Sequence, residues 1–238
     1  ELAALNRLEL EYSLAEGGVD TFSALTVQPL YEGPDKQHNI FTQARFAHGD
    51  ERDTGNIGLA WRYMSPDETH LYGANLFLDH QWPYNHNRLS LGLDYKTALL
   101  GLHLNKYFAL SDWAQRDDGF DERPLGGFDT EISGRVPQAP GLELFARGFR
   151  WDRDPTPIVN PDGDDLWGYE FSAEYTPINM LTLEAALEDD DESDPSGSVA
   201  VQLNYNLWDP ESRPFARPDY DLDSVAGRRF EKVRREND

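Results

Sequence analysis

The segment Ser198-Val199-Ala200-Val201-Gln202-Leu203-Asn204-Tyr205-Asn206-Leu207 alternates strictly between apolar residues and polar or small ones. Successive side chains of a β-strand point to opposite faces, so this period of two predicts a strand with one apolar and one polar face. The same alternation, in places blurred by a glycine, a proline or a charge, predicts eleven further strands: Leu8–Leu14, Leu25–Leu30, Ile40–Ala47, Ile57–Met64, Tyr72–Leu78, Arg88–Tyr95, Leu100–Phe108, Phe128–Val136, Leu142–Phe149, Trp167–Tyr175 and Leu181–Leu187.

The links between these strands differ in length and chemistry. Those after odd-numbered strands are mostly long and charged: Ala47–Thr54, Gln81–Asn87, Ser111–Gly126, Trp151–Asp165 and Asp189–Gly197. Those after even-numbered strands are tight and rich in proline and glycine: Ser65–Thr69, the residues around Thr97, Pro137–Gly141 and Thr176–Asn179. Outer-membrane barrels combine short periplasmic turns with longer external loops. Alternation alone also fits a soluble barrel with an apolar core. The difference in length between the two sets of links favours a membrane barrel whose apolar face contacts lipid.

Aromatic residues at the predicted strand ends support the same choice. The predicted topology places Tyr63, Tyr95, Tyr175, Tyr205 and Trp208 at the periplasmic ends, and Trp167 at an outer end. Aromatic girdles mark both interfaces of a membrane barrel. The sequence therefore predicts an all-β fold, a twelve-stranded antiparallel transmembrane β-barrel of the outer membrane.

Composition narrows the function classes. The 238 residues carry a formal charge of -23, which disfavours nucleic acid as a partner, and no cysteine, which removes disulfides and thiolate sites. No run approaches the roughly 18 apolar residues of a membrane helix. No signal peptide opens the chain at Glu1, so we expect a piece of a longer exported protein.

The polar face of the predicted strands carries charges of both signs. If the apolar face meets lipid, these residues line the lumen as a mixed-charge wall suited to holding a polar chain. The wall is predicted to contain Glu9, Glu11, Arg45, Arg62, Arg88, Asp94, Glu131, Arg135, Arg147, Glu170, Glu174 and Glu184. Lys106 falls on the lipid-facing parity, so we expect it near the headgroup level.

The last 31 residues differ from the rest. We divide the chain into a barrel, residues 1–207, and a linker, residues 208–238, which is too polar to form a strand in lipid. Ser224 is predicted to cap a short helix running to Arg235. We expect the linker to thread the lumen and plug it, with its basic residues facing luminal carboxylates; a solvated helix face is the alternative. Its key residues are Ser224, Gly227, Arg228, Arg229, Lys232, Arg234 and Arg235.

Catalytic, cofactor and metal sites are not predicted. Asp79 and His80 are adjacent in a strand, so they point to opposite faces and cannot act together as an acid and base pair. The acidic run Glu188–Asp194 offers hard oxygen ligands for Ca²⁺ but lacks the glycine turn of a ligand loop, so a solvated external loop is the other interpretation.

Several motifs resemble the membrane domains of intimins and invasins, the inverse autotransporters. They cover nearly the whole chain and include Gly73-Ala74-Asn75-Leu76-Phe77-Leu78-Asp79-His80, Leu104-Asn105-Lys106-Tyr107-Phe108 and, in the linker, Ser224-Val225-Ala226-Gly227-Arg228-Arg229-Phe230 and Val233-Arg234-Arg235-Glu236-Asn237. The resemblance implies a translocator that anchors and exports its own C-terminal passenger.

The resemblance also implies a set of partners. These are outer-membrane lipid and lipopolysaccharide, the passenger segment itself, the barrel-assembly machinery and periplasmic chaperones. A host receptor is expected only through a passenger beyond Asp238. The location implied is the outer membrane of a Gram-negative bacterium, and no cofactor is expected. A general diffusion porin and, less favoured, a barrel enzyme are the alternatives.

Overall fold

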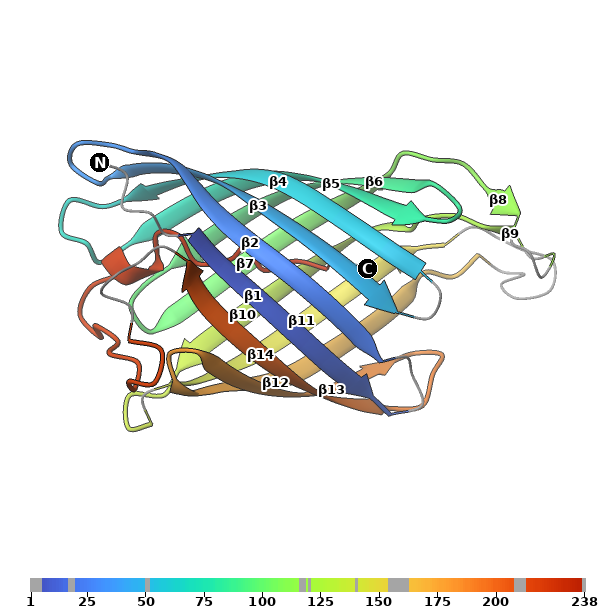
Figure 1. The fold of residues 1–238 in the computed structure, drawn as a ribbon. Coiled ribbons are helices and arrows are strands. Elements are labelled where there is room, and N and C mark those ends of the chain that lie inside the picture. The colour runs from blue at the N-terminus through green and yellow to red at the C-terminus, as the bar shows by residue number, and fades with distance from the viewer. Residues whose placement is uncertain are drawn as a thin grey trace.

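The computed structural model describes residues 6–16, 20–49, 52–115, 119, 121–139, 141–153, 163–207 and 213–236. Twelve of its strands form one closed antiparallel barrel (Figure 1). In chain order they are β1 (Asn6–Ala15), β2 (Thr21–Glu32), β3 (His38–Gly49), β4 (Arg52–Met64), β5 (Leu71–Trp82), β6 (His86–Lys96), β7 (Leu100–Ala109), β10 (Gly126–Arg135), β11 (Leu142–Asp152), β12 (Leu166–Ile178), β13 (Leu181–Asp190) and β14 (Ser196–Leu207).

The barrel closes between its first and last strands. β1 pairs with β14 from Asn6↔Leu207 to Ala15↔Ser198, so neither strand is left with a free edge. Each of the twelve predicted segments coincides with one barrel strand, which confirms the predicted fold. A small hairpin that alternation did not predict, β8 (Ala114–Gln115) with β9 (Asp121–Glu122), lies within the link from β7 to β10.

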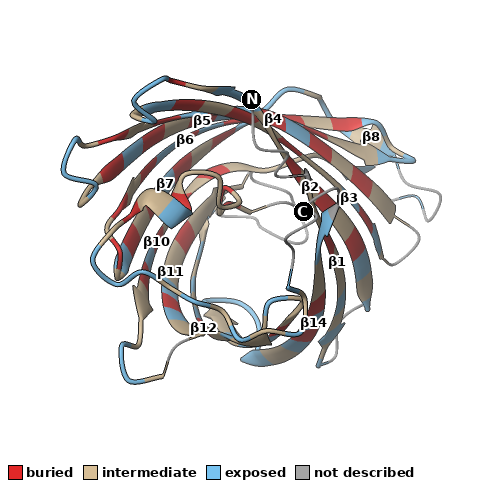
Figure 2. Ribbon diagram, turned by 60° about the vertical axis from the view of Figure 1, so that its left-hand side comes forward, coloured by how far each residue is buried: buried red, intermediate tan, exposed pale blue. Residues whose placement is uncertain are grey.

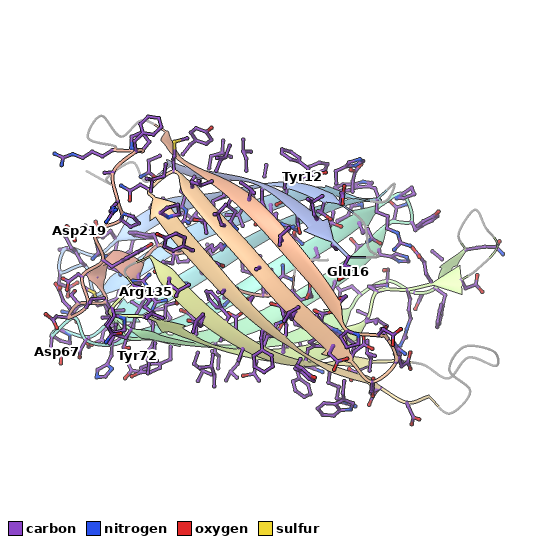
Figure 3. All side chains as sticks on the ribbon, turned by 90° about the horizontal axis from the view of Figure 1, so that it is seen from below. Tyr12, Glu16, Asp67, Tyr72, Arg135 and Asp219 are labelled. Carbon is purple, nitrogen blue, oxygen red and sulfur yellow. The ribbon has the colours of Figure 1, made fainter. Side chains whose placement is uncertain are left out.

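The apolar parity of the strands faces outward. Ile57, Leu93 and Ile132 each expose 59% of their surface, whereas Arg62, between apolar neighbours on β4, is fully buried. Buried and exposed residues alternate along β4, β5 and β6 (Figure 2), and Tyr12 and Tyr72 project from the outer surface (Figure 3). An apolar exterior around a polar interior is the reverse of a soluble barrel and the pattern of a lipid-facing one.

The two ends of the barrel are less different than predicted. The turn end carries the tight links such as β4–β5, and the loop end carries the long links 110–125 and 153–165. The links expected to be long after β3 and β5 are tight, because β3 continues to Gly49 and β5 to Trp82. Charged residues stay in the ladder there: His48 Nδ1 lies 2.7 Å from Asp53 Oδ1, and both side chains are exposed beyond the apolar band.

Aromatic rings gather at the turn end. Tyr72 and Tyr95 lie 5.3 Å apart between ring centroids, and His38 lies 5.1 Å from Tyr63. At the loop end Trp167 is 54% exposed. Trp208 falls outside the described residues.

Lys106 faces outward at the loop end, where its Nζ lies 3.5 Å from Asp152 Oδ2. Lys106 lies three residues before the loop end of β7, and we expect the lipid headgroups at this level of the barrel. Among the described residues, no helix is long and apolar enough to cross a membrane.

Candidate functional site in the barrel lumen

The tail, residues 213–236, returns into the barrel after β14. It first runs along the turn end, where the Asn179 N–H donates to the Ala216 carbonyl over 2.9 Å. It enters the lumen at Val225, whose N–H donates to the Glu68 carbonyl over 2.8 Å. From there it runs inside the barrel towards the loop end (Figure 1).

The β4–β5 turn holds the point of entry. The Ser224 hydroxyl lies 2.8 Å from Glu68 Oε2, and the fully buried Val225 packs against Met64 and Leu71. Within the turn, hydrogen bonds from the Ser65 hydroxyl and from Thr69 lower the pKa of the Asp67 carboxyl below its ordinary value. A charged, hydrogen-bonded turn therefore supports the tail where it enters.

The predicted helix from Ser224 to Arg235 is wrong. Only one short 3₁₀ turn forms, η1 (Ala226–Arg228), and Ser224 does not act as its N-cap residue. The Ser224 hydroxyl does accept the Ala226 N–H, over 3.1 Å. Beyond η1, side chains of the barrel take the place of helical hydrogen bonds to the tail's main chain.

Eight described hydrogen bonds join side chains of the barrel to the tail's main chain. The donors and acceptors are polar residues on the lumen faces of β3, β4, β6 and β7, and each lies within 3.4 Å of its main-chain partner. They are Gln43 with Val233 N and O, Arg62 with the carbonyls of Arg228, Arg229 and Glu231, Asn105 with the Arg234 carbonyl, Arg88 with the Glu236 carbonyl, and the Tyr107 hydroxyl with Glu236 N. An extended tail thus has its buried polar groups satisfied, as burial requires.

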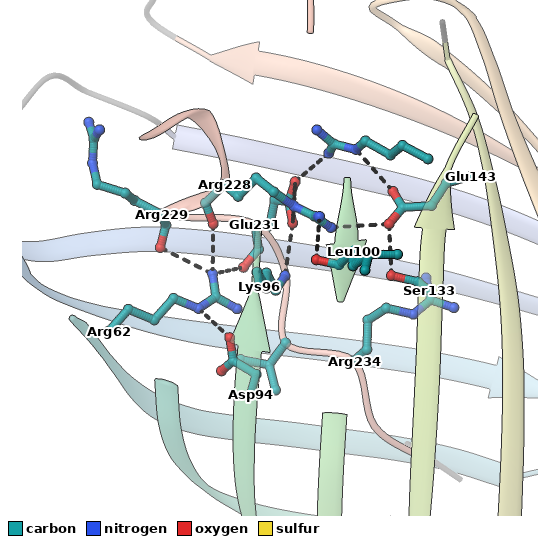
Figure 4. Close-up of polar contacts among 12 residues, drawn as sticks. Arg62, Asp94, Lys96, Leu100, Ser133, Glu143, Arg228, Arg229, Glu231 and Arg234 are labelled. Carbon is teal, nitrogen blue, oxygen red and sulfur yellow. Dashed lines mark hydrogen bonds and ion pairs between the residues drawn. The ribbon is translucent and has the colours of Figure 1, made fainter. Parts of the chain in front are cut away.

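Arg62 is the centre of this arrangement (Figure 4). Its Nη1 donates to three tail carbonyls over 2.8–3.2 Å, while its Nε donates to Asp94 Oδ1 over 3.0 Å. Its guanidinium also lies 4.9 Å from the ring centroid of Phe41. A fully buried guanidinium needs several such partners, because an uncompensated charge in this position costs several kcal/mol.

A second ionic network surrounds Arg228 near the turn end (Figure 4). Arg228 donates to Glu143 Oε1 over 3.1 Å and to the carbonyls of Thr97, in the β6–β7 turn, and Leu100, the first residue of β7. Glu231, three residues on, accepts from Lys96 over 2.8 Å and from Arg135 over 2.6 Å. Cations and carboxylates therefore alternate between tail and wall, so that Arg228 and Glu231 are both paired.

Apolar packing holds the middle of the tail. Val233 is 3% exposed in a cluster with Leu25, Val27, Phe41, Ala60 and Phe77, against which Phe230 also packs. Burying a valine stabilises by about 1.5–3 kcal/mol relative to leaving it in water. The packing of Val233 and Phe230 against the wall was not predicted, because the tail has no apolar stripe in its sequence.

Near the loop end the tail ends in two further ion pairs. Arg235 binds Asp79 with both terminal nitrogens, at 2.8 Å from Nη1 to Oδ1, and Asp79 also accepts from Arg88 and Asn56. Glu236 pairs with Arg147. The described tail therefore spans the lumen from the β4–β5 turn to the loop end.

The sequence profile of the family described as "Inverse autotransporter, beta-domain" matches residues 3–237, which is almost the whole chain. The chain belongs to this family. It is an outer-membrane translocator barrel of a Gram-negative bacterium, so the turn end faces the periplasm and the loop end faces outward.

Relatives of this inverse autotransporter barrel include long surface proteins. The inverse autotransporter adhesin YeeJ of Escherichia coli K12 is 28% identical over 220 residues, which are 89% of this chain and 9% of YeeJ. Intimin of Citrobacter freundii is 27% identical over 203 residues, 83% of this chain and 21% of intimin. The putative attaching and effacing protein homolog of E. coli K12 is 28% identical over 177 residues, 73% of this chain and 57% of that protein. The chain thus spans less than two thirds of each relative.

Solved structures show the same architecture. A chain from the structure described as "Unveiling the Mechanism Behind the in-meso Crystallization of Membrane Proteins" superposes with a TM-score of 0.83 at 24% identity, over 98% of this chain and 97% of that one. The KdgM porin gives a TM-score of 0.54 at 9% identity, over 84% and 99%. Outer membrane phospholipase A from E. coli gives 0.53 at 12% identity, over 84% and 92%. At these identities the likeness shows the fold alone.

The structure brings most of the predicted lumen residues to the tail. Arg62, Arg88, Glu131, Arg135 and Glu174 contact it directly. Two others act through neighbours, since Asp94 pairs with Arg62 and Glu170 pairs with Arg147. Arg45 and Glu184 line a cavity beside the tail.

Among the predicted linker residues, Arg229 pairs with Glu32 of β2 over 3.0 Å. Gly227 is part of η1, where no atom lies close to the position of an added Cβ.

Sequence reasoning missed several residues that hold the tail. They are Gln43, Asp79, Lys96, Asn105, Tyr107 and Glu143, each on the lumen parity of its strand. Alternation along each strand shows that these side chains face the lumen. No neighbouring residue in the sequence indicates that they contact the tail. His80, on the opposite parity from Asp79, stacks edge-on with Trp82, 4.3 Å between centroids.

The acidic external run forms a turn. Asp190 Oδ1 accepts the N–H groups of Glu192 and Ser193 over 2.8 and 2.6 Å. Over the described part of the chain, no group of three histidine, cysteine or acidic side chains is placed to hold a metal ion.

Proposed function

We propose that this barrel anchors a longer protein in the outer membrane and exports and displays the passenger that follows residue 238. In this account residues 1–207 are the translocator and residues 208–238 are the linker. The observation that carries the proposal is the course of the tail, which follows a last strand that ends at the turn end and then runs inside the lumen towards the loop end. A chain that already crosses its own barrel places whatever follows it on the cell surface.

The lumen is built to hold an extended polypeptide. Residues 225–236 run from the β4–β5 turn to the loop end, and a hydrocarbon core of about 30 Å needs only about nine extended residues. Many wall contacts are to main-chain atoms, as at Arg62 and Gln43, so they do not depend on the tail's side chains. Such contacts suit a barrel through which different sequences pass before the final segment stays. No cofactor or nucleotide takes part in this account.

The family match supports the translocator over the other two candidates. A diffusion porin needs an open lumen, whereas here the tail occupies one side of it. One barrel of similar fold is an outer-membrane phospholipase, but at 12% identity the likeness does not assign a catalytic role to any residue of this chain. Membership of the family is also the reason to expect three further partners, namely lipopolysaccharide, the barrel-assembly machinery and periplasmic chaperones. A surface receptor is expected only through the passenger.

The test is the position of a reporter. An epitope with an adjacent protease site, fused after Asp238 and expressed in E. coli with a signal peptide, should be cleaved in intact cells. The same epitope fused after Leu207 should be cleaved only after the outer membrane is opened, because the last strand ends on the periplasmic side. Equal protection of both fusions in intact cells would contradict the proposal.

A further inference from the structure

The tail fills only one side of the lumen. Two cavities, of about 150 and 140 Å³, lie between the tail and the wall that runs from β10 to β14 and on to β1; the second also reaches β2 and β3. The first extends towards the turn end, past Arg7, Thr182 and Gln202. The second extends towards the loop end, past Glu11, Arg45, Glu170 and Glu184. Each could hold several water molecules, and both are lined by charged groups.

The same three residues line both cavities, namely Glu174, Lys232 and Arg234. The two spaces therefore meet at one level of the lumen, and these side chains stand between them. Without them the cavities would join into one water-filled path beside the tail.

The tail reaches the opposite wall through alternate residues. Val233 and Arg235 point to the wall of β2–β7, where they meet Phe77 and Asp79. Lys232 and Arg234 point the other way. Lys232 Nζ lies 3.4 Å from Glu9 Oε2 on β1, and Arg234 pairs with Glu174 on β12.

Arg234 is held in place from three strands. Its Nε donates to Glu131 Oε1 on β10 over 2.6 Å, and its guanidinium stacks 3.8 Å from the ring centroid of Phe145 on β11. With Glu174 on β12, this makes one rigid bridge from tail to wall. The planar guanidinium suits such a multiply paired position better than a flexible ammonium does.

We propose that Lys232 and Arg234 form an ionic seal across a cation-preferring water path that runs beside the tail, along β10–β14 and β1. The tail's main chain alone does not close the lumen; these two side chains do. The inference rests on the proposed function in one respect, that the tail occupies the lumen in the membrane.

Charge sets the preference of the path for cations. Apart from Lys232 and Arg234, the described residues lining the two cavities together carry nine carboxylates and seven cationic side chains. The excess of carboxylates lies in the cavity nearer the loop end, which has seven carboxylates and three arginines. Carboxylates in excess along a narrow path attract cations and repel anions. Removing the two bridging cations therefore both opens the path and leaves its wall acidic.

Single-channel conductance of the full chain in planar lipid bilayers, in KCl, tests the proposal. The double variant Lys232→Ala/Arg234→Ala should open in discrete steps, with a reversal potential in a KCl gradient that favours K⁺ over Cl⁻. Wild-type protein should stay nearly closed. So should two controls. Lys232→Arg conserves the charge and leaves the Arg234 bridge in place, and Arg229→Ala removes a tail cation that lines neither cavity.

A second variant changes the wall in place of the tail. Glu9→Gln/Glu174→Gln keeps the size of both side chains but removes the ion pairs, and it should also open the path. If the tail variant fails to fold, as judged by heat-modifiable migration on gels, the wall variant decides the outcome.

A chain ending at Leu207 separates the two proposals. If that truncated chain conducts but both double variants stay closed, the seal is wrong and the tail's main chain plugs the barrel, with the proposed function intact. If the truncated chain is as closed as the wild type, the tail is not the plug, and both the seal and its premise fail. Channel openings that favour Cl⁻ over K⁺ would contradict the proposal that the path prefers cations.

Discussion

Lumen-facing side chains are buried on one side of the barrel wall and only half-buried on the other. On the packed wall, the lumen faces of β2–β7, every described lumen-facing residue of β4 from Thr54 to Met64 and of β5 from Leu71 to Asp79 is buried. On the open wall, the lumen faces of β12–β14 and β1, residues such as Glu184 and Glu188 are only half-buried. The difference is the tail, which packs against one wall and reaches the other with Lys232 and Arg234.

This contrast separates two uses of charge in one lumen. Buried ion pairs on the packed wall fix the position of the tail, since a buried charge that loses its partner is costly. Charges on the open wall that do not contact the tail, such as Glu184, face the cavity beside it, which has room for water, and there screening and solvation make single residues replaceable. Substitutions of the same type should therefore have different effects on the two walls.

The largest effect is expected at Asp79, whose carboxylate binds both Arg88 and Arg235. Asp79→Ala should lower the free energy of unfolding by about 3–5 kcal/mol, because it leaves two buried guanidinium groups without their carboxylate. Glu184→Ala on the open wall should change it by less than about 0.5 kcal/mol. Urea unfolding of the detergent-folded protein measures both, and equal losses would remove the distinction between the walls.

A smaller effect is expected from adding an arginine to each wall. Ser90 is 1% exposed and lies between Phe77 and Tyr107 in the ladder, beneath Arg235. Ser90→Arg should destabilise the protein by about 1–3 kcal/mol through overpacking and should make the tail more sensitive to protease.

The matched position on the open wall is Ala186, whose ladder neighbours are Ser172 and Ser198. Ala186→Arg has room to enter water and should be nearly neutral. On the outer surface Leu91→Arg should cost about 2–4 kcal/mol, as for any cation placed in the lipid-facing band. Tolerance of arginine at both lumen positions would show that Ser90 is not covered by the tail.

The smallest effect concerns apolar contact within the tail. Val233→Ala should lower the free energy of unfolding by about 1–2 kcal/mol, since Val233 is buried among five apolar residues of the packed wall. Leu222→Ala, at 37% exposure before the tail enters the lumen, should cost much less. Differential scanning calorimetry in detergent compares the two, and a larger loss at Leu222 would mean that the anchor lies outside the lumen.

The barrel was predictable from sequence because its signal is local. Alternation along each strand gave all twelve strands and the facing of residues such as Arg62 and Leu91. It could not separate the packed wall from the open one. That distinction depends on pairs far apart in the chain, such as Gln43 with Val233, 190 residues away.

The tail itself was predicted less well. Ser224 as a possible cap favoured a helix after it. In the barrel, however, Arg62, Gln43 and Asn105 make the hydrogen bonds to the tail's main chain that a helix would make within itself. Tertiary contacts thus override local propensity here. The basic cluster predicted carboxylate partners but not which strands carry them, because Glu131 and Glu174 become neighbours of Arg234 only once the barrel has closed.

The position of the tail on one wall is the central claim, and cross-linking tests it directly. The chain has no cysteine, so introduced pairs report without background. Val233→Cys combined with Val27→Cys on the packed wall should join in membrane-embedded protein when treated with an oxidant or a short thiol cross-linker. Val233→Cys combined with Glu184→Cys on the open wall should stay unlinked under the same conditions. Linking of the second pair in place of the first, or of neither pair in folded protein, would contradict the account.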